Sequence, residues 1–545
     1  MKEWWEVLSK EAAARICLRE QSAQTMRYQK NAFSREYHRS AVGTEMSDPE
    51  WKEATRDVLI AERKRVEQYI EELFRTASPE VVLLHGPKGI TMPYLLQNLG
   101  TGRFMWSFAL AASGSSTSES ILHDYLSHCA AWFMCWQYEP PALDPLSESF
   151  ELSAQERLAQ LSKLTPVESR ALWVSREIST AVISAFADLS PENSWLKGAV
   201  SEYWNLAAAI SVHDNGAADF AKLSVDIQVA GNTNDLSRLV EMLSLQAGSR
   251  ANTQFEKLIF EGEADRHPWV RFNKVALPLA NREAMLSAEV AFLGVIDRLE
   301  NTGVRGKAYE RAVASICAKF LPDADVLEDG LYVGSLECDV VLDSPAARKR
   351  VIIECKSKRP GRPVSALTAS VESDVIHGIE QVAKRIQAFS DSALTQNGTT
   401  LPLLPGGKMV GLVLPCHSYG GAIWSTKLLE ALGAESEVEV IPLPQFIMVL
   451  RAMANSDEFH RYLLRRKGFW RFGYRTFDEL EPLMAYLRKV RIPFSEPRDS
   501  LLLFENYALP SDVVYGSTVP KSAQDWKDLL MSQTREVSPP PIFPI

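Results

Sequence analysis

The sequence lacks the features of secreted, membrane-embedded and disulfide-bonded proteins. Its 545 residues contain no run of about 18 uncharged apolar residues that would span a bilayer. The N-terminus carries charges throughout, so we expect no signal peptide. The seven cysteines are scattered without CxxC spacing, which favours reduced thiols in a cytoplasmic protein over a disulfide framework.

The chain also lacks an excess of positive charge. Its formal net charge is −10 at pH 7, so a polyanion is repelled by the chain as a whole and any nucleic-acid binding must depend on local basic patches. Hydrophobic residues at 46% and charged residues at 23% are ordinary for a globular protein. Because one hydrophobic core stops growing at roughly 250 to 300 residues, we expect several domains.

Residues 1–300 are expected to form a mainly helical region with a sensing, oligomerisation or regulatory role. An amphipathic stretch lies between Pro49 and Arg75, and residues 153–300 show helical periodicity. We expect one small α/β part near 78–150, where residues 81–84 resemble a buried strand followed by a glycine-containing turn at 86–89. That turn lacks the spacing of a phosphate-binding loop, so an ordinary turn leading into a helix is the better interpretation.

The composition changes near residue 300, and residues 301–455 are expected to form an α/β domain with a central mixed sheet. The pattern predicts a helix from 309, strands at 336–342 and 351–356 joined by a turn, and later strands near 409 and 438 with helices between them. Residues 456–545 then form a basic, aromatic helical extension with a proline-rich tail. The fold class is therefore multidomain, with a largely α-helical half before an α/β domain.

Acidic and basic side chains converge on the two adjacent strands. Because side chains alternate along a strand, Glu354 and Lys356 share one face and Cys355 lies on the other. Pairing of the strands through their turn brings Asp339 near Glu354. Burial of two like charges costs several kcal/mol unless they are compensated. Oxygen ligands without convergent His or Cys favour Mg²⁺ or Mn²⁺ as the compensating ion.

Such an ion polarises a phosphate and lowers the pKa of bound water, while Lys356 orients that water or stabilises the developing charge. The arrangement of Glu310 on a helix, Asp339 on one strand and Glu354 with Lys356 on the next resembles the PD-(D/E)XK nuclease superfamily, whose core is that of type II restriction endonucleases. Cys338 stands where the name motif has proline. The resemblance covers residues 301–455 only.

The resemblance implies a restriction-endonuclease-like fold and assigns a role to each matching residue. Asp339 and Glu354 would hold the metal, assisted by Glu310 and the backbone carbonyl of Cys355, and Lys356 would assist the attacking water. Gln381, on the helix after the second strand, matches a further catalytic glutamine of some branches. A solvated helix face is the alternative for Glu310 and Gln381, and a surface salt-bridge hairpin is the alternative for the strands.

Two basic clusters are candidates for binding the nucleic-acid backbone. One cluster lies near the site and the other in the C-terminal extension. The cluster in the extension interleaves aromatic side chains with cations, as surfaces that combine stacking with phosphate contacts do. It suits equally well a solvated helix whose aromatic residues belong to the core. The candidate residues are Lys358, Arg359 and Arg362 near the site, and Arg465, Arg466, Lys467 and Arg471 in the extension.

These patterns together predict a Mg²⁺-dependent endonuclease. We expect nucleic acid as its partner, with DNA favoured over RNA by the habit of the superfamily, together with a homo-oligomer or a partner subunit and no membrane. The large N-terminal half suggests a regulated effector of the kind used in antiphage defence. The alternative is a catalytically inactive, nuclease-like module that binds nucleic acid or serves in assembly.

Overall fold

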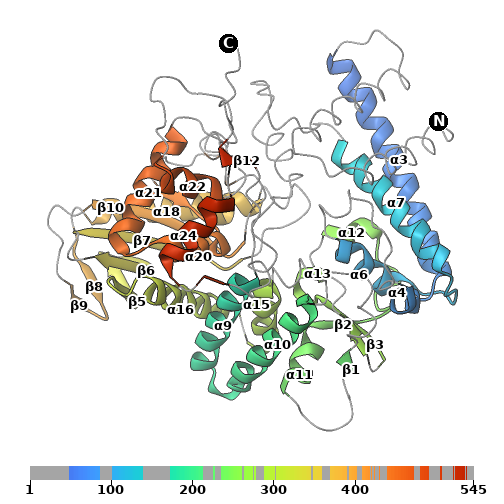
Figure 1. Cartoon of the computed structure of the whole chain (residues 1–545), viewed down its shortest axis with the longest axis horizontal. Coiled ribbons are helices and arrows are strands. Elements are labelled where there is room, and N and C mark those ends of the chain that lie inside the picture. The colour runs from blue at the N-terminus through green and yellow to red at the C-terminus, as the bar shows by residue number, and fades with distance from the viewer. Residues whose placement is uncertain are drawn as a thin grey trace. The chain divides into compact units, whose positions relative to one another are not determined.

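The chain divides into two compact units, Met1–Pro145 with Ile210–Ala284 and Leu146–Ala209 with Met285–Ile545. We call these the first unit and the second unit (Figure 1). The structure, a computed structural model, describes residues 48–85, 101–138, 172–212, 225–226, 235–260, 263–273, 275–277, 288–300, 302–344, 348–358, 369–389, 392–401, 408–417, 419, 423, 429, 438–471, 479–489, 504–505, 519–520, 522–533 and 535–536.

The first unit is built mainly from helices around an aromatic core. The long helix α3 confirms the amphipathic stretch predicted between 49 and 75, and it packs along α7. Phe74, Phe108, Tyr125 and Phe255 lie within ring contact in the core. The described helices of this unit are α3 (Asp48–Thr76), α4 (Glu80–His85), α6 (Thr101–Ala111), α7 (Glu119–Tyr138), α11 (Asp235–Met242), α12 (Phe255–Phe260) and α13 (Glu263–Arg266).

The strand predicted at residues 81–84 is wrong, because these residues form helix α4. The backbone N–H of Glu80 donates to Ser78 Oγ over 3.3 Å, and Val81 and Val82 are buried where α4 packs against α6 and α7. A short apolar run suits a strand and a buried helical turn equally, and tertiary packing overrides the β preference of valine. The glycine-containing turn at 86–89 lies outside the described residues.

The first unit also contains a small four-stranded sheet within a region for which helices were predicted. Its order is β1-β4-β3-β2, and only the β2–β3 pair is parallel. Its strands have two to four residues, too few for an alternating pattern to stand out from the helical periodicity around them. They are β1 (Val225–Asp226), β2 (Ser244–Gln246), β3 (Trp269–Phe272) and β4 (Val275–Leu277).

The second unit is centred on a mixed seven-stranded sheet of order β11-β10-β7-β6-β5-β8-β9. The β7–β10 and β10–β11 pairs are parallel and the others antiparallel. The strands predicted near 336, 351, 409 and 438 are all present, whereas β5, β8 and β9 were not predicted. The seven are β5 (Asp325–Val333), β6 (Leu336–Ser344), β7 (Lys349–Lys356), β8 (Leu394–Gln396), β9 (Thr399–Thr400), β10 (Lys408–Pro415) and β11 (Val438–Val440).

Helices from distant parts of the chain cover this sheet. Helix α16 packs on β5, β6 and β7 and is itself covered by α9 and α15, while α18 packs on β7, β10 and β11. A π-helical turn, Val371–Ile376, leads directly into α18. The helical elements in this part of the chain are α9 (Leu172–Leu189), the 3₁₀ turn Pro191–Asn193, α10 (Trp195–Val212), α15 (Ala288–Leu299), α16 (Thr302–Phe320), α18 (His377–Ala388) and α20 (Leu443–Ala452).

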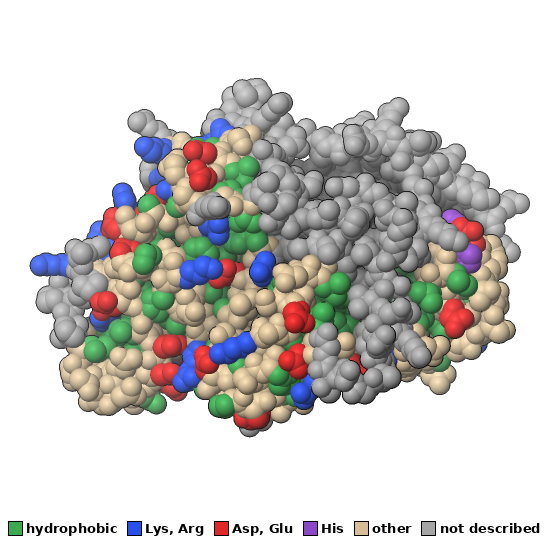
Figure 2. Space-filling view, turned by 60° about the horizontal axis from the view of Figure 1, so that its bottom comes forward, with side chains coloured by type: hydrophobic (Ala, Val, Ile, Leu, Met, Phe, Trp, Pro, Cys, Tyr) green, Lys and Arg blue, Asp and Glu red, His purple; other side chains and the backbone are tan. Residues whose placement is uncertain are grey.

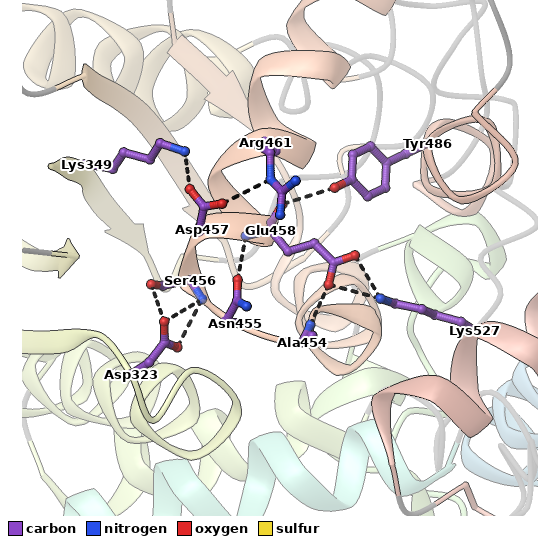
Figure 3. A network of polar contacts seen from close by, with 10 residues as sticks. All are labelled: Asp323, Lys349, Ala454, Asn455, Ser456, Asp457, Glu458, Arg461, Tyr486 and Lys527. Carbon is purple, nitrogen blue, oxygen red and sulfur yellow. Dashed lines mark hydrogen bonds and ion pairs between the residues drawn. The ribbon is translucent and has the colours of Figure 1, made fainter. Parts of the chain in front are cut away.

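The C-terminal extension is docked against the sheet through the start of α21 (Figure 3). Asn455 Oδ1 accepts the Glu458 N–H at 2.8 Å and Glu458 Oε2 accepts the Ala454 N–H at 2.7 Å, a reciprocal cap on the helix. Lys349 at the start of β7 pairs with Asp457. The extension comprises α21 (Ser456–Arg471), α22 (Leu480–Leu487), β12 (Phe504–Glu505), α24 (Ala523–Gln533) and β13 (Arg535–Glu536). No helix within the described ranges has both the length and the apolar character that crossing a bilayer requires.

Candidate active site

Asp339 and Glu354 meet where the pairing of β6 with β7 ends. The antiparallel register runs from Ser344 opposite Lys349 to Val340 opposite Ile353. Immediately beyond it, Asp339 Oδ2 accepts the backbone N–H of Cys355 at 2.7 Å. The aspartate side chain therefore replaces a backbone carbonyl as acceptor, and this holds it beside β7. The predicted pairing of the two strands is present, and it places Asp339 beside the end of β7 that carries Glu354.

Glu354 and Lys356 share one face of β7, as strand alternation predicts. Lys356 Nζ donates to Glu354 Oε1 at 2.7 Å and to Gln381 Oε1, on α18, at 2.8 Å. Gly378 makes this approach of helix to strand possible. A Cβ atom at that position would lie 3.1 Å from Lys356 Cε and 3.0 Å from Val413 Cγ1, tighter than ordinary van der Waals contact. Gln381, a weaker match to the superfamily, thus contacts the central lysine of the site.

Arg385 is a residue of the site for which sequence analysis assigned no role. It lies one helical turn after Gln381 on α18 and donates to Glu354 Oε2, while its Nη2 atom lies 4.0 Å from Asp339 Oδ1. The side chain is buried. Both oxygens of Glu354 are therefore engaged, one by Lys356 and one by Arg385. The i, i+4 spacing from Gln381, which places two residues on one helical face, was the available signal.

The site holds Asp339 in surroundings that disfavour its charge. Burial, and next the negative charge of Glu354, raise the pKa of Asp339 to about 7, against the lowering effects of the Cys355 N–H and Arg385. Glu310 adds to this rise. Burial is therefore the main reason that the charged form of Asp339 is disfavoured, and the negative charge of Glu354 adds to this effect.

Glu310 lies on α16 and acts on the site through its charge. Its own pKa is raised chiefly by burial, and Lys307 Nζ donates to its Oε2 at 2.9 Å. Lys307 also pairs with Asp329 at 2.7 Å, a residue with φ of +60° at the bulge in β5. The side chain of Glu310 is thus largely buried rather than solvated, and it pairs with Lys307.

The donor set fits a hard divalent cation in its chemistry. Asp339 and Glu354 offer oxygen atoms from adjacent strands, and carboxylate oxygens are ligands that hard divalent cations prefer. Within the described residues, however, no three His, Cys, Asp or Glu side chains are grouped closely enough to form a metal site. The guanidinium of Arg385 donates to one oxygen of Glu354. The role of the Cys355 carbonyl stays a prediction.

The residues predicted to bind nucleic acid occupy different environments. Arg466 is buried and bonds Glu439 and Glu479 in the core between α21, β11 and α22, so its assignment to a nucleic-acid surface is wrong. Arg465 and Lys467 are partly exposed on the same helix. The side chain of Lys358 is 68% exposed, with Nζ 3.7 Å from Asp374 Oδ1. Two residues, Arg359 and Arg362, lie outside the described residues, as does the side chain of Arg471.

Charged side chains of both signs lie on the described part of one face of the molecule (Figure 2). On the face shown in Figure 2, Lys and Arg side chains of the described residues are interspersed with Asp and Glu side chains. This pattern agrees with the negative net charge of the chain. It leaves local groups such as Lys358 as the contacts to test for nucleic-acid binding.

Comparison with protein-family models, with curated proteins and with solved structures found no significant match to this chain.

Proposed function

We propose that the second unit is a metal-dependent endonuclease that hydrolyses phosphodiester bonds of nucleic acid, DNA in preference to RNA. The observation that carries this proposal is the meeting of Asp339 and Glu354 at the end of the β6–β7 pairing with Lys356 beside them. The order of helix, strand and strand, with Glu310 on the first helix, agrees with the resemblance to the PD-(D/E)XK superfamily.

Each side chain has a definable task in this proposal. Asp339 and Glu354 would hold Mg²⁺ or Mn²⁺, and Glu310 would add negative charge from α16. The bound ion supplies Lewis-acid polarisation of the phosphate and a lower pKa for bound water. Lys356 has three donor protons, and the bonds to Glu354 and Gln381 use two of them. The third can orient a water molecule or contact a phosphate oxygen.

Cleavage by single-site variants tests the proposal. The purified full-length chain is incubated with plasmid DNA, single-stranded DNA or RNA, with Mg²⁺ or with EDTA. We expect Mg²⁺-dependent cleavage that is reduced at least 100-fold in Asp339→Ala, Glu354→Ala and Lys356→Ala, a typical scale for loss of one group that stabilises the transition state. The control is Lys319→Ala, at the C-terminal end of α16, which removes an ion pair with Glu177 of α9. This variant should cleave like the unaltered chain. Undiminished cleavage by any of the three variants would remove that residue from the mechanism.

A second candidate function is supported by the bonds of Glu354. Because Lys356 and Arg385 already engage both of its oxygens, the same site also suits a nuclease-like module without catalysis that binds nucleic acid or serves in assembly. Binding of DNA or RNA without strand breaks, under every metal condition, would favour this module over the endonuclease.

A further inference from the structure

The guanidinium of Arg385 lies beside both carboxylates that were predicted to share a cation. It bonds Glu354 Oε2 and lies 4.0 Å from Asp339 Oδ1, and it is buried at 7% exposure. Gln381, one turn earlier on α18, holds Lys356 against the other oxygen of Glu354. Helix α18 thus presents one amide and one cation to the end of β7.

A divalent cation bound by Glu354 would have to share a carboxylate oxygen with a cationic hydrogen-bond donor, because Lys356 donates to Oε1 and Arg385 donates to Oε2. An ion shared by Asp339 and Glu354 requires a carboxylate lone pair at a coordination distance of about 2.0–2.1 Å for Mg²⁺. Glu354 Oε2 already accepts a charge-assisted hydrogen bond from Arg385. Two positive charges at this place would also repel each other inside a buried site. The two modes of charge compensation therefore oppose one another.

We propose that Arg385 is a built-in counter-cation that competes with the divalent ion for Glu354, so that the Arg385–Glu354 ion pair and a loaded metal site exclude each other. The identity of the competing ion rests on the proposed function. Arg385 is a positioning residue in this scheme, because it acts on Glu354. The chain then has a metal-free state that is neutralised by its own side chain, and metal loading is set by the strength of that ion pair.

The same two strands carry a matched control. Arg350 on β7 pairs with Asp343 on β6, Nη2 to Oδ2 at 2.5 Å, and both side chains are largely buried. The two residues are direct partners in the register and lie at the opposite end of β7 from Glu354. Substitution of Arg350 therefore removes a buried arginine–carboxylate pair from the same hairpin without removing a competitor from the site.

The test measures Mn²⁺ affinity of the EDTA-stripped full-length chain by titration calorimetry and by electron paramagnetic resonance of free Mn²⁺. We expect R385Q to bind Mn²⁺ at least tenfold more tightly than the unaltered chain, R385K to be intermediate, and R350Q to stay within twofold. The melting temperature without metal should fall in both R385Q and R350Q, and Mn²⁺ should restore it only in R385Q. The double variant with E354Q should lose the gain in affinity.

The inference would be overturned if R385Q, shown to be folded by circular dichroism, bound Mn²⁺ no more tightly than the unaltered chain. It would also be overturned if no variant bound Mn²⁺. The fate of the proposed function is read separately from cleavage of DNA and RNA by the unaltered chain. Tighter Mn²⁺ binding in R385Q together with no cleavage by any variant supports the competition and refutes the nuclease.

Discussion

Asp339 carries the clearest conflict between stability and function at the scale of single residues. Its pKa is raised to about 7, first by burial and then by Glu354. The unfolded chain ionises this group near pH 4, so the folded state binds more protons between about pH 4 and 7. Its ionisation therefore destabilises the fold as pH rises through this window, and the destabilisation is complete above pH 7.

Asp339→Asn is expected to raise the melting temperature of the metal-free chain at pH 8 while abolishing cleavage. The amide oxygen can still accept the Cys355 N–H, but the buried negative charge is gone. This rise in melting temperature should be smaller at pH 5, where Asp339 is protonated in the folded state. Thermal unfolding in EDTA at the two pH values checks this, and a lower melting temperature at pH 8 would contradict it.

His460 on α21 provides the opposite pH dependence. Burial, and next the charge of Lys349, lower its pKa to about 4 from an ordinary 6.5. The unfolded chain then binds more protons between these values, so the contribution of His460 to stability is complete above pH 6.5 and is lost as pH falls to 4.

His460→Leu should remove this part of the acid sensitivity. Urea unfolding at pH 7 and at pH 4.5 should show a smaller loss of unfolding free energy in the variant than in the unaltered chain. Equal losses in the two proteins would contradict the assignment.

At the scale of elements, the β6–β7 hairpin was predictable and its surroundings were not. Strand alternation is a local rule, and it correctly joined Glu354 to Lys356. Strand β5 was missed because Asp329 and Gly330, both at positive φ, interrupt its alternation with a bulge. Arg385 was missed because only the packing of α18 decides which helical face meets the site.

The basic cluster of α21 shows the same limit. Aromatic and cationic residues alternate through it, but the sequence does not reveal which face is buried. Arg466 proves to be a core residue between Glu439 and Glu479. A pattern of composition thus identified the helix and misassigned one of its cations.

Arg466→Met is expected to lower the free energy of unfolding by about 3–5 kcal/mol, because it leaves two buried carboxylates without their partner.

Lys358→Ala, at an exposed side chain, should change stability by less than about 0.5 kcal/mol and weaken DNA binding to a similar degree for all DNA sequences. Urea denaturation and filter binding measure the two effects. If the Arg466→Met variant were as stable as the unaltered chain but bound DNA more weakly, Arg466 would have to be assigned to the nucleic-acid surface.

At the scale of the whole molecule, the second unit is assembled from two separated parts of the chain. Helix α9 packs on α16 and α15, and its residues Ile178, Val182 and Phe186 are fully buried. Burial of each such side chain stabilises a fold by about 1.5–3 kcal/mol. The seven-stranded sheet therefore depends on residues that precede it by more than one hundred positions.

A fragment of residues 301–545 is expected to unfold without cooperativity and to bind a hydrophobic dye, because it lacks α9 and α15. A chain in which residues 172–209 are joined by a flexible linker to 285–545 should unfold cooperatively. Calorimetry and dye fluorescence compare the two. A melting temperature of the short fragment within a few degrees of the linked one would show that α9 is dispensable.

This discontinuity also has a consequence for synthesis on the ribosome. Helix α9 ends at Leu189 and α16 begins at Thr302. The apolar face of α9 therefore leaves the exit tunnel long before α16, which packs on it, has been synthesised. At about 5–20 residues per second, the delay lasts roughly 6 to 23 seconds. Nascent chains at this stage are natural clients for chaperones, and slower, cooler expression should increase the yield of folded protein.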